Sequence, residues 1–376
     1  MTRFVIIGNP ENRRVTMFQA ALAAQNVPPA TVIAWRDLMA PGAPARVLGT
    51  LPSGPAIVRI DSAGEDEDLE RALIRRGEPA ARAEGYAAVD ARGLDDTPRE
   101  LGRILYPRQH HLGFLAVLHE LDAALAERPD WRVPQPVKAI EELFDKRITS
   151  ANWQALGIPV PEFLTGVRDP ADLRVRMRAA GWSSVFVKVA SSSSASCLAI
   201  YTIEARSEHA LTTVEDTPGG RYNTRKLQRV STRRGLDRLL GFLLAEGSQI
   251  ERAVPKAQID DSYFDLRVLT IDGVPAFIVV RSAPHPITNL HLGGQRGDLA
   301  ALKQRVPKPS WDAAMASCVA VQRASGAFHV GIDLMFEPDL SAHRVIEGNA
   351  FGDLLPNLER DGLDVYGWQI ARLLRA

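Results

Sequence analysis

Two short acidic segments near the C-terminus are the sequence feature that most constrains the fold and the function of this chain. Residues 331–335 read as a strand that carries Asp333, and a second strand-like segment carries Glu347 and Asn349. The turn-forming residues 337–339 lie between them, so the pattern predicts a hairpin that brings three oxygen ligands to one end. Carboxylate and amide oxygens suit Mg²⁺, which completes its shell with phosphate oxygens and water. The alternative is a hairpin that carries these acids without a metal.

Two lysines upstream stand in contexts that favour anion binding. Lys146 follows an acidic, helix-like segment, and Lys188 lies inside the β-branched run 184–189, which reads as a buried strand. Lysine is rare in such a run unless its ammonium meets an anion. Behind it comes a serine-rich segment, residues 191–196, whose N–H groups and hydroxyls could wrap a phosphate, with Ser192 and Ser193 as candidates. The alternative for each lysine is a surface position with the ammonium in solvent.

The order of these signals along the chain resembles the ATP-grasp superfamily. The signals are, in order, Lys146, Lys188 with the serine-rich segment, Glu251, Asp265 with Arg267, Arg281, Asn289 with Gly293 and Gly294, Asp333, and Glu347 with Asn349. From Lys138 onward the chain is most similar to the ribosomal-protein glutamate ligases and the glutathione synthetases. It departs from their pattern after Lys188, where many relatives have a glycine-rich loop and this chain has serines.

The resemblance implies a fold, an activity and cofactors. The fold would be α/β (α+β ATP-grasp), with an N-terminal parallel α/β domain followed by a two-subdomain ATP-grasp module. The activity would be a carboxylate–amine ligase that forms an amide or peptide bond through an acyl phosphate. It would use ATP and Mg²⁺, as two ions, with Mn²⁺ as the alternative metal. A small-molecule kinase with the same nucleotide site, and a nucleotide-binding regulatory or scaffold protein, are the competing hypotheses.

The resemblance also implies roles for individual residues. Lys146 and Lys188 would contact the α- and β-phosphates of ATP, while Glu251 would accept the adenine amino group. The remaining roles are ring contact by the backbone of Ala253, ribose binding by Asp260 or Asp261, contact with the reacting phosphate by Arg267, Arg281 and Asn289, and Mg²⁺ binding by Asp333, Glu347 and Asn349.

The pattern of strands and helices predicts three units. Strand-like residues 4–8, 31–35 and 56–61 alternate with a helical segment, 14–24, which favours a parallel α/β domain. The proline-rich segment 128–136 is the expected linker. We therefore expect an N-terminal domain at 1–135, a central subdomain at 136–245 and a C-terminal subdomain with the metal site at 246–376. Apolar residues Phe144, Ile148, Ala151 and Ala155 predict a helix face that leaves Lys146 off the stripe.

Composition excludes several function classes. The chain has 376 residues, with 45 basic and 45 acidic side chains, so no bulk charge favours nucleic acid or an anionic membrane. No stretch approaches the roughly 20 apolar residues of a membrane span, and the N-terminus lacks the apolar run of a signal peptide. We expect a cytoplasmic protein in which the two cysteines, Cys197 and Cys318, are small core residues.

The acceptor substrates, a small-molecule or peptide carboxylate and an amine, should bind where the domains meet. The N-terminal domain offers Arg59 and Asp61 at the end of a predicted strand, and Arg108 in a polar and aromatic segment. An arginine fork binds a carboxylate through two parallel hydrogen bonds, so Arg59, with Arg108 second, is expected to orient the acceptor. The alternative is an Arg59–Asp61 ion pair that only stabilises the strand end.

Overall fold

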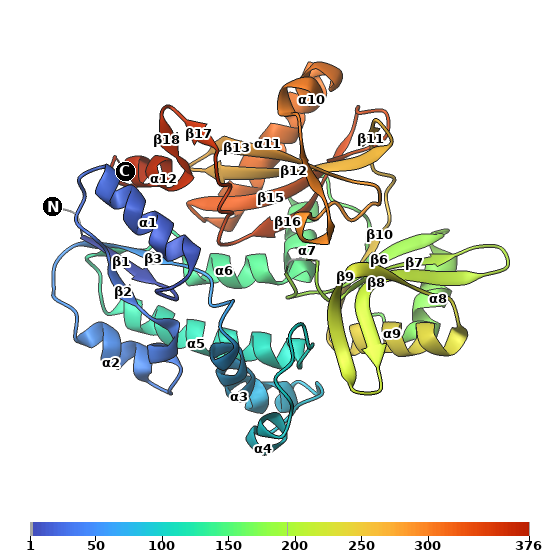
Figure 1. Ribbon diagram of the computed structural model, residues 1–376, viewed down its shortest axis with the longest axis horizontal. Coiled ribbons are helices and arrows are strands. Elements are labelled where there is room, and N and C mark those ends of the chain that lie inside the picture. Colours follow the sequence, from blue (N-terminus) through green and yellow to red (C-terminus); the bar gives the residue numbers. More distant parts are fainter. Residues whose placement is uncertain (1–2, 194, 376) are drawn as a thin grey trace.

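The computed structural model describes residues 3–193 and 195–375, which form three units, each built on its own sheet (Figure 1). The N-terminal sheet is parallel, in the order β2-β1-β3-β4. Its strands are β1 (Arg3–Ile7), β2 (Thr31–Ile33), β3 (Ala56–Ile60) and β4 (Trp131–Arg132). The predicted parallel α/β unit is confirmed. The expected linker at 128–136 contains β4, which pairs with β3.

Helices surround this sheet. They are α1 (Arg13–Ala24), α2 (Ala43–Gly49), α3 (Glu67–Ala83), α4 (Ala91–Asp95) and α5 (Pro107–Ala126), with the short 3-10 helix η1 (Trp35–Leu38). α3 and α5 approach so closely that a Cβ atom on Gly77 would lie 1.8 Å from the carbonyl oxygen of Gln109. The last helix, α12 (Val365–Leu373), returns to pack against α1, where Tyr366 meets Phe18. The N-terminal unit is therefore completed by the C-terminal helix.

The central sheet is antiparallel, in the order β5-β10-β6-β7-β8-β9. Its strands are β5 (Phe163–Leu164), β6 (Ser184–Val189), β7 (Leu198–Ile203), β8 (Glu208–Thr217), β9 (Gly220–Val230) and β10 (Ser248–Arg252). Helices α8 (Pro170–Ala179) and α9 (Arg233–Ala245) contribute their leucines to its core. The expected boundary after residue 245 falls just before β10, which the structure places in this central sheet.

The C-terminal sheet follows the order β14-β13-β12-β15-β16, with β11 paired to β12. Its strands are β11 (Gln258–Ile259), β12 (Ser262–Ile271), β13 (Val274–Ala283), β14 (Gln295–Gly297), β15 (His329–Phe336) and β16 (His343–Asn349). β12 and β13 are joined by Asp272 and Gly273, both with positive φ, as expected for a tight hairpin turn. The predicted hairpin of Asp333 and Glu347 is the antiparallel β15–β16 pair.

Helices and short strands complete this unit. They are α6 (Val137–Phe144), α7 (Lys146–Ala155), α10 (Leu299–Arg305), α11 (Lys308–Ser325), the 3-10 helix η2 (Leu290–Leu292), β17 (Glu359–Arg360) and β18 (Leu363–Asp364). Helices α6 and α7 pack on β16, although they precede the central sheet in sequence. Cys197 and Cys318 are both free and buried, as predicted. No helix in the described part of the chain is long and apolar enough to cross a membrane.

Candidate active site

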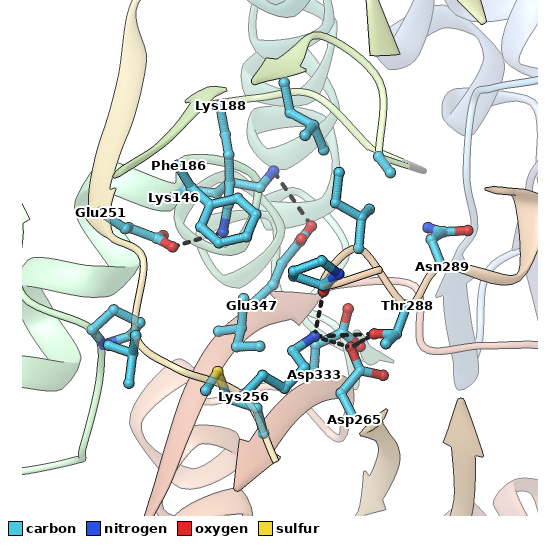
Figure 2. A pocket seen from close by; sticks show the side chains of 18 of the residues that line it. Lys146, Phe186, Lys188, Glu251, Lys256, Asp265, Thr288, Asn289, Asp333 and Glu347 are labelled. Atoms are coloured by element: carbon cyan, nitrogen blue, oxygen red, sulfur yellow. Dashed lines mark hydrogen bonds and ion pairs between the residues drawn. The ribbon is translucent and has the colours of Figure 1, made fainter. Parts of the chain in front are cut away.

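A cavity lies between the central and C-terminal sheets, and Figure 2 shows the side chains that line it. Its empty space is about 890 Å³ including the opening to solvent. The predicted site residues that line it are Lys146, Lys188, Ser192, Glu251, Arg281, Asn289, Asp333 and Glu347. Residues that lie up to about 200 positions apart in the sequence are thus brought to one cavity.

The first cation of the cavity, Lys188 on β6, forms an ion pair with Glu251 on the neighbouring strand β10. Its Nζ donates to Glu251 Oε2 at 2.6 Å and lies over the Phe186 ring (Figure 2). Glu251 is 2% exposed, and its Oε1 is buried with no hydrogen-bond partner among the described residues. A buried acceptor without a donor is costly, so this oxygen is available to a ligand that brings an N–H group.

The second cation, Lys146, begins α7 directly after Asp145, whose side chain accepts from the N–H of Arg147 and caps the helix. Lys146 Nζ donates to the carbonyl oxygens of Ala190 and Ser192, and it lies 3.3 Å from Glu347 Oε1. The lysine therefore joins the start of α7, the serine-rich loop and β16 at one point of the cavity wall.

The apolar face predicted around Lys146 is wrong. Phe144 ends α6, and Asp145 has extended dihedral angles, so the periodicity of the sequence crosses a break between two helices. As a result Ile148, Ala151 and Ala155 are exposed, whereas α7 buries Lys146, Thr149, Ser150 and Trp153. The inference that Lys146 faces a cleft still holds, because the helix start and not its apolar stripe sets the direction of this side chain.

The acidic pair is set by strand register. Asp333 on β15 lies opposite Glu347 on β16, beside a bulge. Two arginines flank Asp333, with Arg267 Nε 2.5 Å from Oδ1 and Arg281 Nη2 3.1 Å from Oδ2. Burial disfavours ionisation of Glu347, but Lys146 and the other nearby cations hold its pKa below the ordinary value. The Glu347 carboxylate is therefore kept charged near neutral pH by the cations that face it.

The donor set fits Mg²⁺ better than a metal held by protein alone. Among the described residues no three His, Cys, Asp or Glu side chains form a metal-binding group. Asn349 donates its Nδ2 to the carbonyl oxygen of Gly331, which leaves only its Oδ1 as a ligand atom. Mg²⁺ commonly takes one or two carboxylates and fills its shell with phosphate oxygens and water. Asp333 and Glu347 match that requirement.

Lys256 and Thr288, which the sequence analysis missed, form a buried polar cluster with Asp265 and Arg281 beside Asp333. Lys256 Nζ donates to the carbonyl oxygen of Pro286, to Thr288 Oγ1 and to Asp265 Oδ2, at 2.8, 3.1 and 3.3 Å (Figure 2). Arg281 Nε donates to the other oxygen of Asp265 at 2.7 Å. Burial opposes ionisation of Asp265, but the two cations hold its pKa well below the ordinary value. The cluster therefore holds the loop that contains Asn289 against β12.

Six predicted site residues outside the N-terminal domain do not line the cavity. Two of them, Arg267 and Asn349, contact Asp333 and the carbonyl oxygen of Gly331, respectively. Ser193 is exposed, and Ala253 follows β10 and donates its N–H to Ser184 O. Asp260 and Asp261 form the exposed tip of the β11–β12 hairpin, both with positive φ, and Asp260 pairs with Arg305. Side chains at such a tip point to solvent, so the expected ribose contact by this pair is not supported by its position.

The residues of the N-terminal domain that were expected to contact the acceptor are engaged with other protein groups. Arg59 is 6% exposed, its Nε donates to Asp61 Oδ2 at 3.0 Å, and its Nη1 donates to Gln369 Oε1 at 2.8 Å. Its guanidinium also lies over the rings of Phe18 and Tyr366. The alternative interpretation, an Arg59–Asp61 ion pair, is the one observed, and α12 covers it.

The second acceptor candidate, Arg108, is also engaged in structural contacts. Its N–H donates to Glu246 Oε2 and its Nη2 donates to Glu84 Oε2, both at 2.9 Å. Its guanidinium lies over the ring of Tyr86. Arg108 therefore ties the start of α5 to the end of α9 and does not line the cavity.

Arg59→Ala is expected to destabilise the fold and leave nucleotide binding unchanged. Removing one partner of a buried pair commonly costs about 3–5 kcal/mol, because the other charge stays buried. Urea unfolding should show this loss. Arg36→Ala is the matched control, since Arg36 pairs with Glu11 and Asp66 at 58% side-chain exposure, and it should change stability by less than about 1 kcal/mol. Changed acceptor kinetics at unaltered stability would instead support a substrate role.

Comparisons with known proteins identify the fold of this chain. The chain matches no protein-family model and no curated protein. Solved structures match over nearly its whole length. The ATP-grasp ligase PsnB, complexed with precursor peptide PsnA2 and AMPPNP, has a TM-score of 0.53 at 16% identity and covers 100% of this chain and 97% of its own. The chain has the ATP-grasp fold. The predicted fold class is confirmed.

Two further ATP-grasp structures match equally well. D-cycloserine synthetase DcsG has a TM-score of 0.54 at 16% identity, with 99% of each chain covered. The macrocyclase MdnC from Microcystis aeruginosa MRC, bound with precursor peptide MdnA, has a TM-score of 0.54 at 13% identity, also with 99% of each chain covered.

Proposed function

We propose that this protein is an ATP- and Mg²⁺-dependent carboxylate–amine ligase. The observation that carries the proposal is the convergence, in one cavity of an ATP-grasp fold, of Lys146 and Lys188 with the opposed carboxylates Asp333 and Glu347. Joining a carboxylate to an amine in water requires that a carboxylate oxygen become a good leaving group. Phosphorylation by ATP meets that requirement, and the cavity has the cations and oxygen ligands that phosphoryl transfer needs.

The nucleotide would lie across the cavity between the two sheets. Lys146 and Lys188 bind its phosphates, and the N–H groups of the loop at Ser192 could add contacts. The free Oε1 of Glu251 accepts from the adenine amino group, and the backbone near Ala253 follows the ring edge. Phe186, Leu198, Met335 and Ile346, which line the same cavity, supply an apolar slot for the base.

The metal would be held beside the phosphate-binding lysines, since Glu347 lies 3.3 Å from Lys146. Asp333 and Glu347 supply carboxylate oxygens and Asn349 supplies its Oδ1, while phosphate oxygens and water complete the shell. When bound, the metal neutralises charge on the phosphates. Two ions, as in related phosphoryl-transfer sites, would fit the opposed carboxylates, and Mn²⁺ should substitute.

Arg281, with Arg267 and Asn289 nearby, would act on the reacting groups. In the first step an oxygen of the acceptor carboxylate forms a bond to the γ-phosphorus, and the bond from that phosphorus to ADP breaks. In the second step the amine nitrogen attacks the acyl carbon, inorganic phosphate leaves with the bonding electrons, and the nitrogen releases a proton to the departing phosphate or to water. Negative charge develops on the transferring phosphoryl group and then on the acyl oxygen, where a fixed guanidinium stabilises it.

Substrate-dependent ADP release tests the proposal. Purified protein with ATP and Mg²⁺ is incubated with pooled amino acids, small acids and peptides, and products are identified by mass spectrometry. A ligase gives ADP together with a condensed product. A phosphorylated product without condensation would identify a kinase. Nucleotide binding without substrate-dependent ADP release across these pools would favour a regulatory protein and overturn the proposal.

A further inference from the structure

The cations at the phosphate end of the cavity are all paired with carboxylates of its own wall. Lys188 pairs with Glu251 at 2.6 Å, Lys146 with Glu347 at 3.3 Å, and Arg281 with Asp333 at 3.1 Å. The carboxylates therefore occupy the positions beside the cations that phosphate oxygens would take. Without a ligand, positive and negative charges in the wall nearly balance.

Two of these carboxylates are the proposed metal ligands, and Glu347 is the more exchangeable. Asp333 is held between Arg267 and Arg281 and is 13% exposed at its side chain. Glu347 has the longer contact, 3.3 Å to Lys146, which is its one ion pair among the described residues, and its side chain is 23% exposed. A longer and more exposed ion pair is weaker, so Glu347 can leave Lys146 at lower cost.

We propose that Glu347 exchanges partners when the metal–nucleotide complex binds, and that this exchange couples the two ligands. Lys146 transfers from Glu347 to a phosphate, and Glu347 transfers from Lys146 to the metal. A nucleotide without metal must still compete with Glu347 for Lys146, and it meets the freed carboxylate as a like charge. A metal without nucleotide must likewise compete with Lys146. Each ligand thus raises the affinity for the other, as linkage requires. This inference rests on the proposed function.

The test is whether one variant binds ADP more tightly without metal and more weakly with Mg²⁺. Calorimetry measures ADP binding to the full chain, once with Mg²⁺ and once with EDTA. In Glu347→Gln the competing charge is gone, so metal-free ADP should bind roughly fivefold tighter or more. The same variant should bind ADP more weakly with Mg²⁺, because a metal ligand is lost. A residue that acts only structurally would lower both affinities together.

A matched control and a reciprocal variant complete the design. Glu337→Gln removes a similar carboxylate just after β15, where Glu337 pairs with Arg344 at 2.7 Å away from the cavity, and both affinities should stay as in wild type. Lys146→Met should tighten Mn²⁺ binding without nucleotide, because Glu347 loses the lysine with which it forms an ion pair. Electron paramagnetic resonance of the free ion measures this affinity.

The failures are distinguishable. If the wild-type chain binds ADP with Mg²⁺ and Glu347→Gln does not tighten metal-free binding, the exchange is overturned and the nucleotide site stands. If Lys146→Met leaves Mn²⁺ affinity unchanged, the exchange is likewise overturned. If the wild-type chain binds ADP in neither condition, the proposed function fails instead.

Discussion

Lys188→Met is expected to weaken ATP binding by a factor of roughly ten to 150 and to destabilise the fold. A charge-assisted contact to a phosphate is commonly worth about 1.5–3 kcal/mol, which corresponds to that range of affinity. The second effect follows from the ion pair, because Glu251 is 2% exposed and would remain as a buried charge without its partner. Such a loss commonly costs about 3–5 kcal/mol. Calorimetry and urea unfolding measure the two effects.

The two effects of this substitution can be separated by a second change. The double variant Lys188→Met, Glu251→Gln removes both charges, so its stability should recover most of the loss while phosphate affinity stays low. Lys138→Met is the control for a lysine with an exposed partner, since its side chain is 83% exposed beside Glu142, and it should change neither quantity. Wild-type ATP affinity in a folded Lys188→Met protein would exclude a phosphate role for Lys188.

Arg281→Lys is expected to lower kcat by about 10²–10³ while the KM for ATP changes little. Loss of one positioned donor to a developing oxyanion commonly has this size. Lysine keeps the charge but cannot contact Asp265 and Asp333 at once, as the Nε and Nη2 of Arg281 do. The measurement is steady-state kinetics with the acceptor identified by the ADP-release screen.

The control for this prediction is Arg296→Lys on the neighbouring strand. Arg296 lies opposite Arg281 in the β13–β14 register but is exposed. Its substitution should leave kcat within a factor of two or so, because Arg296 is exposed and donates to the carbonyl oxygen of Pro356, which does not line the cavity. Equal losses of kcat in both variants would show that the strand pairing, and not the buried guanidinium, is what matters.

Local patterns predicted the parts of the cavity that depend on strand geometry. Lys188 inside a β-branched run and the acids of the 331–349 hairpin follow from period-two alternation and turn chemistry, and strand register then sets Asp333 against Glu347. Asp272 and Gly273 are a further example, because two residues that accept positive φ determine the hairpin between β12 and β13. In these segments neighbours in the sequence are sufficient to fix the geometry.

Contacts between distant segments could not be predicted in the same way. Arg59 reads as exposed at a strand end because its partner Gln369 lies 310 positions away. Lys256 lies in an irregular segment, where no periodicity signals its contacts with Asp265 and Thr288. The apolar stripe through Ile148 was wrong for a related reason, since a single extended residue changes the phase between two helices. Each error arose where tertiary packing overrides the local pattern.

The return of α12 to the N-terminal sheet has a consequence for biosynthesis. Phe18 is fully buried against Tyr366, and Arg59 bonds to Gln369. The unit built on the parallel sheet is synthesised before α12 and cannot complete its core until α12 has been made. Until then an apolar face of that domain is open to other chains. The entropic cost of closing so long a loop rises only slowly with its length. The main consequence is therefore a delay before the core is complete, and not a large loss of free energy. A nascent chain whose synthesis is stalled before α12 should therefore bind chaperones for longer than a chain in which α12 has left the ribosome.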